Sequence, residues 1–489
     1  MANNSAFTGE EAKLVEQVDA YVDEVWEDVV ADIATMVSYP SLADSTKAEP
    51  NAPYGKDVRS ALDAAKQIAE RLGYECGEDD GYLGWADIAG KNPDVQIATI
   101  AHCDVVPAGA GWDADPFTMR RRDGWLLGRG VIDDKGPLIL SFYAGAFFKR
   151  HNIELPYSFR ALIGCDEEVG MTDVHRYLST HKDPDFLFTP DAEFPVCNAE
   201  KGCYGATFVG PQLPENSVIV DFNGGECTNA IPGIATMIIR ADASKLPAAE
   251  GIDIEPVEAG SCGCGCGCSV VAQAKLTAHG VGGHASMPEG TTNAIAMLVD
   301  YLVEHNLVSD AEKPFVELLS CVHADTAGVA LGVDSCSPAF GPLTCVGGTI
   351  SVVDGHLEQT IDIRYPDSTT GAHMGEVLSA FAQKFGARVC VTRDKEPFSV
   401  AGDSAEVQAL LQTYRDVTGK PAELFSMGGG TYARNFKRAV SFGPEEELED
   451  VPSWVGPMHG PNEGANEQLL RDALKMYIIA INRLMQLEF

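Results

Sequence analysis

Residues 95–137 read VQIATIAHCDVVPAGAGWDADPFTMRRRDGWLLGRGVIDDKGP, and this stretch decides the fold. Its apolar run 95–101 has the length of a buried strand and ends directly on His102, with Asp104 close behind. In open α/β sheets, ligands bind at the carboxyl ends of the strands. The Gly-rich, acidic GRGVIDDKGP that follows therefore predicts that a polar site begins here.

The same pattern, a short apolar strand that ends on charged residues, recurs twice along the chain. The predicted strand 159–165 runs into DEEVG, and the predicted strand 186–188 runs into TPDAEFP. Before them, residues 137–150 begin with Pro and contain no breaker, which predicts a mostly buried helix. Unrelated surface charges have no reason to follow successive strands, so the repetition predicts an α/β domain with a polar site at its strand ends.

A segment of different texture interrupts this domain. Strand-like and helix-like stretches alternate within it, at 235–240, 293–307, 357–364 and 374–385. Helical patterns return from Ser404 onward. We therefore predict a catalytic domain in two parts, 1–205 and 399–489, with an α+β insertion, 206–398, between them.

Composition excludes some classes of partner. The chain has 489 residues and a net charge of −37, from 35 Lys+Arg against 72 Asp+Glu, which argues against nucleic acid and anionic membranes as partners. The first residues lack the basic and apolar segments of a signal peptide, and no run approaches the roughly 18 apolar residues of a membrane span. We expect a soluble, cytoplasmic protein whose 14 cysteines are reduced.

Imidazoles and carboxylates at the predicted strand ends suggest a metal site. The candidate ligands are His102, Asp133, Glu167 or Glu168, Asp191 and His459. A set without thiolates suits Zn²⁺, Mn²⁺ or Co²⁺ better than it suits a structural Cys-bound zinc. The set is larger than one tetrahedral ion needs, whereas two ions bridged by a carboxylate would use all of it.

Five motifs together carry a family resemblance. In chain order they are AHCDVVPAG, GRGVIDDKGP, DEEVG, PDAEFP…NAEKG and MHGPNE. With their spacings they resemble the M20 family of co-catalytic metallopeptidases, and PDAEFPVCNAEKG with the long insertion is most similar to its PepV-type, Xaa-His and carnosinase-like dipeptidases. The resemblance implies an α/β fold of two domains, a mixed-sheet catalytic domain with an inserted α+β lid domain.

The resemblance also implies roles for the candidate ligands. His102 and Asp191 would hold one divalent ion, Glu168 and His459 a second, and Asp133 would bridge both. Zn²⁺ is favoured for both positions, with Mn²⁺ or Co²⁺ as alternatives.

Two further carboxylates receive catalytic roles from the resemblance. Asp104 would orient His102 and set its tautomer. Glu167, adjacent to the ligand Glu168, would be the general base that activates the metal-bridging water.

Three residues of the insertion would act on the substrate. His284, in AHGVGGHASMPEG, matches the family's transition-state histidine better than His279 does and would donate to the oxyanion. Asn229 would help to hold the substrate, and Arg364, in DIRYP, would bind its C-terminal carboxylate. Without the resemblance, Arg364 would be interpreted as an edge-strand arginine on a solvated face.

These observations predict a metal-dependent dipeptidase, a dinuclear metallohydrolase that is a monomer and acts on small peptides. The alternatives are an amidohydrolase that deacylates N-acyl amino acids and a non-catalytic metal-binding or peptide-binding protein, which would have no use for Glu167 beside the ligands. A carboxylate must bind the ammonium of a free dipeptide, and Asp191 and Glu193 are the candidates.

One feature stands outside the resemblance. The tract CGCGCGC, Cys262 to Cys268, places thiols at every second position and could bind Cu(I) or Zn²⁺ if it folded back on itself. Its alternating glycines favour a loop without a metal.

Overall fold

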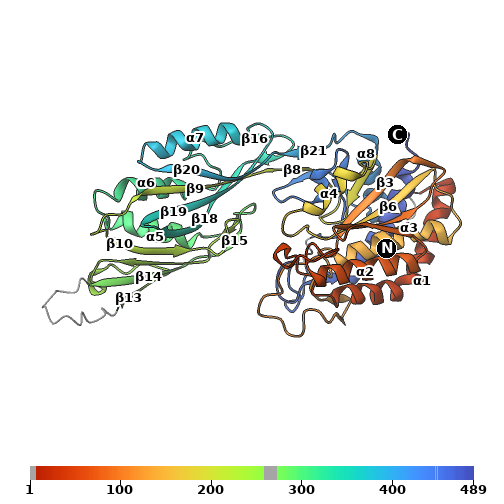
Figure 1. The fold of residues 1–489 in the computed structure, drawn as a ribbon, viewed down its shortest axis with the longest axis horizontal. Helices are drawn as coiled ribbons and strands as arrows, with labels where there is room; N and C mark the ends of the chain where they lie inside the picture. The colour runs from red at the N-terminus through yellow and green to blue at the C-terminus, as the bar shows by residue number, and fades with distance from the viewer. Residues whose placement is uncertain (1–6, 258–271, 447, 449) are drawn as a thin grey trace. The chain divides into compact units, whose positions relative to one another are not determined.

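The computed structural model describes residues 7–257, 272–446, 448 and 450–489, so the Cys262 to Cys268 tract lies outside the described residues. The chain divides into two compact units, one within 1–199, 399–425 and 430–489 and the other within 200–398 and 426–429 (Figure 1). The chain enters the second unit at residue 200 and not at the predicted 206. The reason is that strand β9 (Gly202–Gln212) already belongs to the sheet of the second unit.

The first unit is built on a mixed sheet of nine strands among the described residues. The strand order is β1-β2-β6-β3-β7-β23-β8-β21, and β22 pairs with β8. The strands span Glu75–Asp79 (β1), Leu83–Ile88 (β2), Asn92–His102 (β3), Tyr157–Gly164 (β6), Phe186–Thr189 (β7), Val196–Glu200 (β8), Phe398–Ser399 (β21), Leu424–Met427 (β22) and Ala439–Ser441 (β23).

The central strands of this sheet are parallel. Strand β3 pairs in parallel with both β6 and β7, and β23 pairs in parallel with β7. The carboxyl ends of these strands therefore meet at one edge of the sheet. The predicted α/β class and the three predicted strands are confirmed, and β23 adds a fourth strand that ends at this edge.

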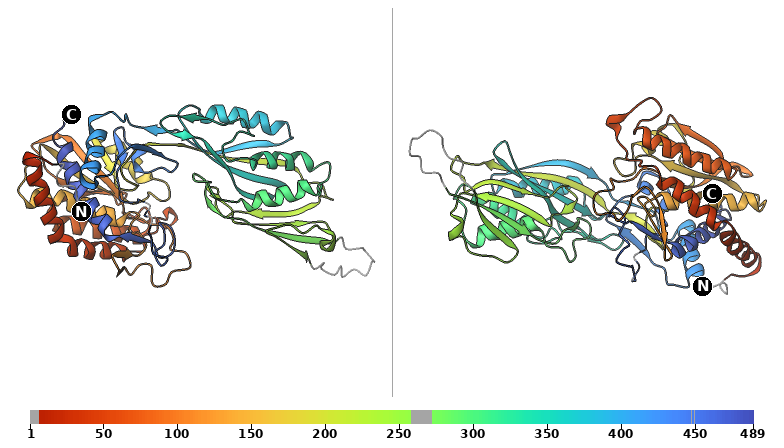
Figure 2. Two further views of the ribbon diagram at one scale, coloured as in Figure 1. Left: turned by 180° about the vertical axis from the view of Figure 1, so that it is seen from behind. Right: turned by 90° about the horizontal axis from the view of Figure 1, so that it is seen from below.

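Helices cover both faces of the sheet, as Figures 1 and 2 show. Their bounds are Gly9–Val37 (α1), Lys56–Arg71 (α2), Lys135–Arg150 (α3), Thr172–Thr180 (α4), Ala405–Thr418 (α8) and Glu467–Leu484 (α9). Alternate residues of a strand face opposite sides. On β6, Phe159 packs into the core with α1, α2, α3, α8 and α9, while Arg160 on the other face contacts Tyr177 of α4.

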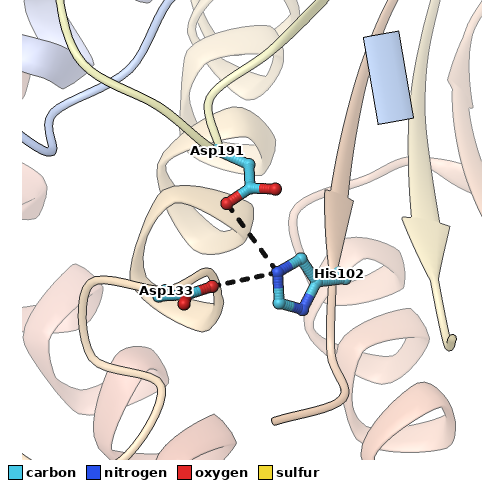
Figure 3. A group of neighbouring side chains, drawn as sticks. All are labelled: His102, Asp133 and Asp191. Carbon is cyan, nitrogen blue, oxygen red and sulfur yellow. Dashed lines mark ion pairs between the residues drawn. The ribbon is translucent and has the colours of Figure 1, made fainter. Parts of the chain in front are cut away.

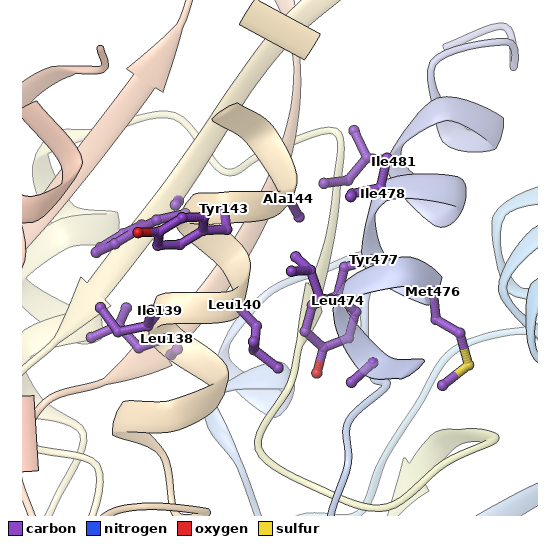
Figure 4. Close-up of a cluster of buried hydrophobic side chains, with 14 of the residues drawn as sticks. Leu138, Ile139, Leu140, Tyr143, Ala144, Leu474, Met476, Tyr477, Ile478 and Ile481 are labelled. Carbon is purple, nitrogen blue, oxygen red and sulfur yellow. The ribbon is translucent and has the colours of Figure 1, made fainter. Parts of the chain in front are cut away.

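Helix α3 lies at the centre of the core. All of its residues from Lys135 to Phe148 are buried, and its Pro137 stands in the first turn, where a missing N–H does not interrupt the helix. Leu140 and Ala144 of α3 pack near Leu474 and Ile478 of α9 (Figure 4). Burying each such leucine or isoleucine side chain contributes about 1.5–3 kcal/mol, so this packing stabilises α3 in the core.

The second unit has an antiparallel sheet of eight strands in the described residues, in the order β13-β14-β12-β10-β18-β19-β9-β20. The strands not yet given are Ile219–Gly224 (β10), Ile234–Ile239 (β12), Ile252–Val257 (β13), Gln273–His279 (β14), Thr344–Val353 (β18), His356–Tyr365 (β19) and Arg388–Lys395 (β20). Short pairs lie beside it: Ala230–Ile231 (β11) with Gly283–His284 (β15), and Cys336–Ser337 (β16) with Gly341–Pro342 (β17).

One face of this sheet carries the second hydrophobic core. Residues buried in β14 alternate with half-buried ones, which is the pattern of a sheet covered on one side. The covering helices are Ala294–Glu304 (α5), Lys313–Val322 (α6) and Gly371–Gln383 (α7). The predicted α+β character of the insertion is confirmed. Within the described residues, no helix combines the length and apolar content needed to cross a membrane.

Candidate metal centre

The parallel strand ends and two loops bring the predicted ligands together in the first unit. His102 is the last residue of β3, Glu168 follows β6, and Asp191 follows β7. Asp133 comes from the loop before α3, and His459 from the loop before strand β24 (Gly464–Asn466), which pairs with β5 (Trp125–Leu127) and through it with β4 (Arg120–Arg122).

His102 faces two carboxylates with one side of its ring (Figure 3). Its Nε2 lies 3.1 Å from Asp133 Oδ1 and 3.9 Å from Asp191 Oδ1. The opposite nitrogen, Nδ1, lies 3.0 Å from the backbone carbonyl of Asp104, which can only accept a hydrogen bond. Nδ1 therefore carries the proton in the neutral ring, and Nε2 presents its lone pair to the carboxylates.

Asp133 reaches a second group with its other oxygen. Its Oδ2 lies 2.7 Å from His459 Nε2, and that same nitrogen lies 3.4 Å from Glu168 Oε2. The described residues thus form two groups with possible ligand atoms within 4.8 Å of one another: His102, Asp133 and Asp191, and Asp133, Glu168 and His459. Asp133 belongs to both groups, as a bridging carboxylate would.

The unpartnered atoms and the donor types of the cluster fit cations bound between these side chains. Among the described residues, the buried His102 Nε2 and Glu168 Oε1 accept or donate no hydrogen bond. Buried polar atoms are normally satisfied, so two such atoms in one cluster indicate a missing partner. Nitrogen and oxygen donors without a thiolate suit divalent zinc, manganese or cobalt.

The pKa values of the shared groups are strongly perturbed. Burial would raise the pKa of Asp133, but the imidazoles of His102 and His459 together hold it well below its ordinary value. Hydrogen bonding to Asp133 and Glu168 raises the pKa of His459 to about 10. Opposed shifts of this kind concentrate at functional sites.

Asp104 contacts more than the imidazole. Its Oδ1 lies 3.5 Å from His102 Nδ1, farther than its own carbonyl oxygen does. Its carboxylate accepts hydrogen bonds from the backbone N–H groups of Glu167 and Glu168, at 3.3 and 3.2 Å. Burial raises the pKa of Asp104 to about 7. Asp104 therefore positions the loop that carries the two glutamates, while its backbone orients the ring.

Glu167 lies beside the ligand groups but belongs to neither of the two formed by described residues. Burial and the negative charge of Asp191 raise the pKa of Glu167 well above its ordinary value. Adjacent residues on a turn point in different directions, which explains how Glu168 joins the cluster while Glu167 stays out of it. A half-buried carboxylate in this position is suited to accept a proton.

Sequence reasoning missed a buried ion pair behind the ligands. Arg129 and Glu463 are each about 1% exposed, and Arg129 Nη1 lies 2.5 Å from Glu463 Oε2. Glu463 accepts the N–H groups of Gly130 and Ile132, while Arg129 Nη2 donates to the carbonyl of His459 at 3.2 Å. The pair ties the Asp133 loop to the His459 loop. Arg129 lies in the motif GRGVIDDKGP and Glu463 in the motif MHGPNE, and their presence in these motifs is the sequence signal that could have identified them.

The second unit brings two of its three predicted site residues together. Strands β11 and β15 pair Ala230 with His284, and Asn229 O accepts the N–H of Ala285 at 2.9 Å. His284 is exposed, and its Nδ1 accepts the backbone N–H of Ser286 at 3.2 Å. The neutral ring therefore carries its proton on Nε2, which is then a hydrogen-bond donor.

Arg364 lies inside the same unit and is not an edge-strand residue. It is on β19, between β18 and β9, and is 5% exposed. Its Nε donates to Asp362 Oδ1 at 2.6 Å, and its Nη1 donates to Gly428 O at 2.6 Å. A side chain added at Gly428 would meet Ser286, so this guanidinium and the His284 turn are connected through Gly428.

Proteins with similar sequences match most of the chain. A protein of Bacillus subtilis (strain 168) named "Putative dipeptidase YtjP" is 33% identical over 426 residues, 86% of this chain and 90% of the relative. A similarly named protein of Staphylococcus haemolyticus is 30% identical over 93% of this chain and 96% of its own length.

Solved structures share the fold. The dipeptidase Dug1p from Saccharomyces cerevisiae matches with a TM-score of 0.59 at 12% identity, over 97% of this chain and 99% of its own. Aminoacylhistidine dipeptidase from Vibrio alginolyticus matches with a TM-score of 0.52 at 14% identity, over 93% of this chain and 96% of its own. The sequence pattern of Peptidase family M20/M25/M40 extends over residues 98–483, and the chain therefore belongs to this family.

Proposed function

We propose that this protein is a metal-dependent dipeptidase that hydrolyses the peptide bond of small peptides with a free C-terminal carboxylate. The observation that carries the proposal is the pair of ligand groups joined by Asp133, with Glu167 beside them and outside both. A protein that only stores or binds metal has no use for such an additional carboxylate. Relatives named as dipeptidases, which match most of the chain, support the choice of substrate.

Two divalent ions would occupy the cluster. His102 and Asp191 would hold one, Glu168 and His459 the other, and Asp133 both. Zn²⁺ suits this set best, with Mn²⁺ or Co²⁺ as alternatives. When bound, such ions supply Lewis-acid polarisation of the scissile carbonyl and lower the pKa of water.

Glu167 is the general base in this proposal. Its carboxylate takes a proton from the attacking water and then delivers that proton to the nitrogen of the departing amine. Asp104 supports this role because it holds the backbone N–H groups of Glu167 and Glu168 and thereby sets the direction of both side chains. Positioned acid–base catalysis contributes typically about 10²–10⁴ in rate.

The residues of the second unit act on the substrate. His284 would donate its Nε2–H to the oxygen that becomes negative in the transition state. Asn229, whose backbone carbonyl accepts a hydrogen bond from Ala285 next to His284, would help to bind the substrate. Arg364 would bind the C-terminal carboxylate, and Asp362 keeps its guanidinium in one orientation.

The test begins with metal-free protein. Zn²⁺, Mn²⁺ and Co²⁺ are added separately, and activity is measured against dipeptides, tripeptides and N-acyl amino acids. We expect dipeptides to give the highest kcat/KM. If N-acyl amino acids are hydrolysed better, the protein is an amidohydrolase of that class and the dipeptidase proposal is wrong.

Two neighbouring variants test the division of labour. Glu167→Ala should lose at least about 10²-fold in kcat and retain its metal. Glu168→Ala, the matched control, should lose metal as well as activity. A Glu167→Ala protein that folds but binds no metal would show that the two roles are exchanged.

A further inference from the structure

A fourth strand end carries a carboxylate that no role has yet used. Strand β23 pairs in parallel with β7, and the chain beyond the two strands continues side by side: Phe442 N–H donates to Thr189 O at 2.8 Å and Glu445 N–H to Ala192 O at 3.1 Å. A side chain at Gly443 would lie 1.6 Å from Pro190 O, so the two segments are in direct contact. Glu445 therefore lies next to the turn that carries Asp191.

The Glu445 carboxylate lies near the candidate metal centre without belonging to it. Burial raises the pKa of Glu445 well above its ordinary value, and the negative charges of Asp191, Asp133 and Asp134 nearby raise it further. It is not part of either ligand group that the described residues form. Its Oε1 is buried and has no hydrogen-bond partner within the described residues.

A buried carboxylate oxygen without a partner is unfavourable unless a cation or a donor completes it. The adjacent Glu446 needs no such completion, because it accepts the Tyr414 hydroxyl at 2.5 Å and lies 3.3 Å from Lys420 Nζ. Glu445 and Glu446 thus have different surroundings: within the described residues Glu446 has a hydroxyl and an ammonium as partners, whereas the buried Glu445 Oε1 has none.

The covalent geometry of a dipeptide indicates which cation could reach the Glu445 carboxylate. In a free dipeptide, bond lengths and the angle at Cα place the ammonium nitrogen about 2.5 Å from the scissile carbonyl carbon. The group that binds this ammonium must therefore lie beside the metal centre. Of the residues predicted for the task, Glu193 is exposed and Asp191 belongs to a ligand group.

We propose that Glu445 binds the N-terminal ammonium of the substrate and so selects free dipeptides over N-acylated compounds. This inference rests on the dipeptidase function proposed above. A charge-assisted hydrogen bond that is lost when the ammonium is removed should change kcat/KM by about 10-fold or more.

The first measurement uses the metal-loaded wild-type enzyme and two substrates that differ only in the amine, alanyl-alanine and propionyl-alanine. We expect alanyl-alanine to be favoured by at least about 10-fold in kcat/KM. If the wild-type enzyme hydrolyses neither, the proposed function fails. If it hydrolyses both equally well, the enzyme does not recognise the ammonium group, and the role of Glu445 is refuted. This conclusion uses the wild-type enzyme alone and does not depend on any variant folding.

The second measurement compares Glu445→Gln with Glu446→Gln. Glu445→Gln should keep the wild-type metal content, lower kcat/KM for alanyl-alanine and leave propionyl-alanine unchanged or better, so that the preference falls by about 10-fold. Glu446→Gln should keep the wild-type preference. An unchanged preference in Glu445→Gln, or loss of metal from it, would overturn the assignment.

Discussion

The buried pair Arg129–Glu463 offers the sharpest test of what positions the side chains of the candidate metal centre. In Glu463→Gln the shape of the side chain is kept and its charge is lost. Arg129, about 1% exposed, then has no counter-charge at 2.5 Å. The new amide must also turn its NH₂ group either to the guanidinium or to the N–H groups of Gly130 and Ile132, which are donors themselves.

The size of the effect follows from this burial. Removing one partner of a buried ion pair typically costs about 3–5 kcal/mol, since the remaining charge is left uncompensated. We expect a loss of this size in the free energy of unfolding of the first unit, measured by urea denaturation of the metal-free protein. Arg129→Met combined with Glu463→Gln should lose less than Glu463→Gln alone, because no buried charge then remains.

Metal affinity is a second, independent measurement on the Glu463→Gln variant. Glu463 accepts a hydrogen bond from the loop that carries Asp133, and Arg129 donates one to the backbone carbonyl of His459. Groups that orient ligands typically contribute about 10–100-fold to affinity, and competition with a chelating indicator should show such a loss. Glu27→Gln is the matched control, since Glu27 pairs with Arg121 but is 77% exposed. The reasoning is refuted if Glu463→Gln resembles Glu27→Gln in both measurements.

Three further outcomes are expected. His284→Ala should lower kcat by about 10²–10³ with little change in KM, because an oxyanion donor acts mainly in the transition state; a change confined to KM would exclude that role. Arg364→Lys should raise KM for free dipeptides and leave amidated dipeptides, already poor substrates, unaffected in steady-state assays. Burial lowers the pKa of His323 to about 4, so only the unfolded chain takes up its proton as the pH falls from about 6.5 to 4. The second unit should lose up to about 3 kcal/mol of stability over that range, and His323→Gln should lose less in urea titrations.

The positions of most candidate ligands at the strand ends could be predicted from the chain alone. Apolar runs that end on His102, on the Glu167–Glu168 turn and before Asp191 indicate strands, and the carboxyl ends of parallel strands meet at one edge. The same rule would have predicted Glu445, which follows the short apolar strand β23. Periodicity and the parallel-sheet rule are local signals, so they carry this information without any knowledge of the fold.

The sequence by itself therefore determined the α/β class, the strand ends and the chemical type of the site. Only the tertiary structure decided which atoms complete it. Arg129 and Glu463 are 334 residues apart, and Glu445 meets the Asp191 turn only because β23 pairs with β7. Asp104 accepts hydrogen bonds from the backbone of the turn that carries Glu167 and Glu168, and this contact depends on the register between β3 and β6. Such partners come together through sheet register and core packing, which no local pattern of residues encodes.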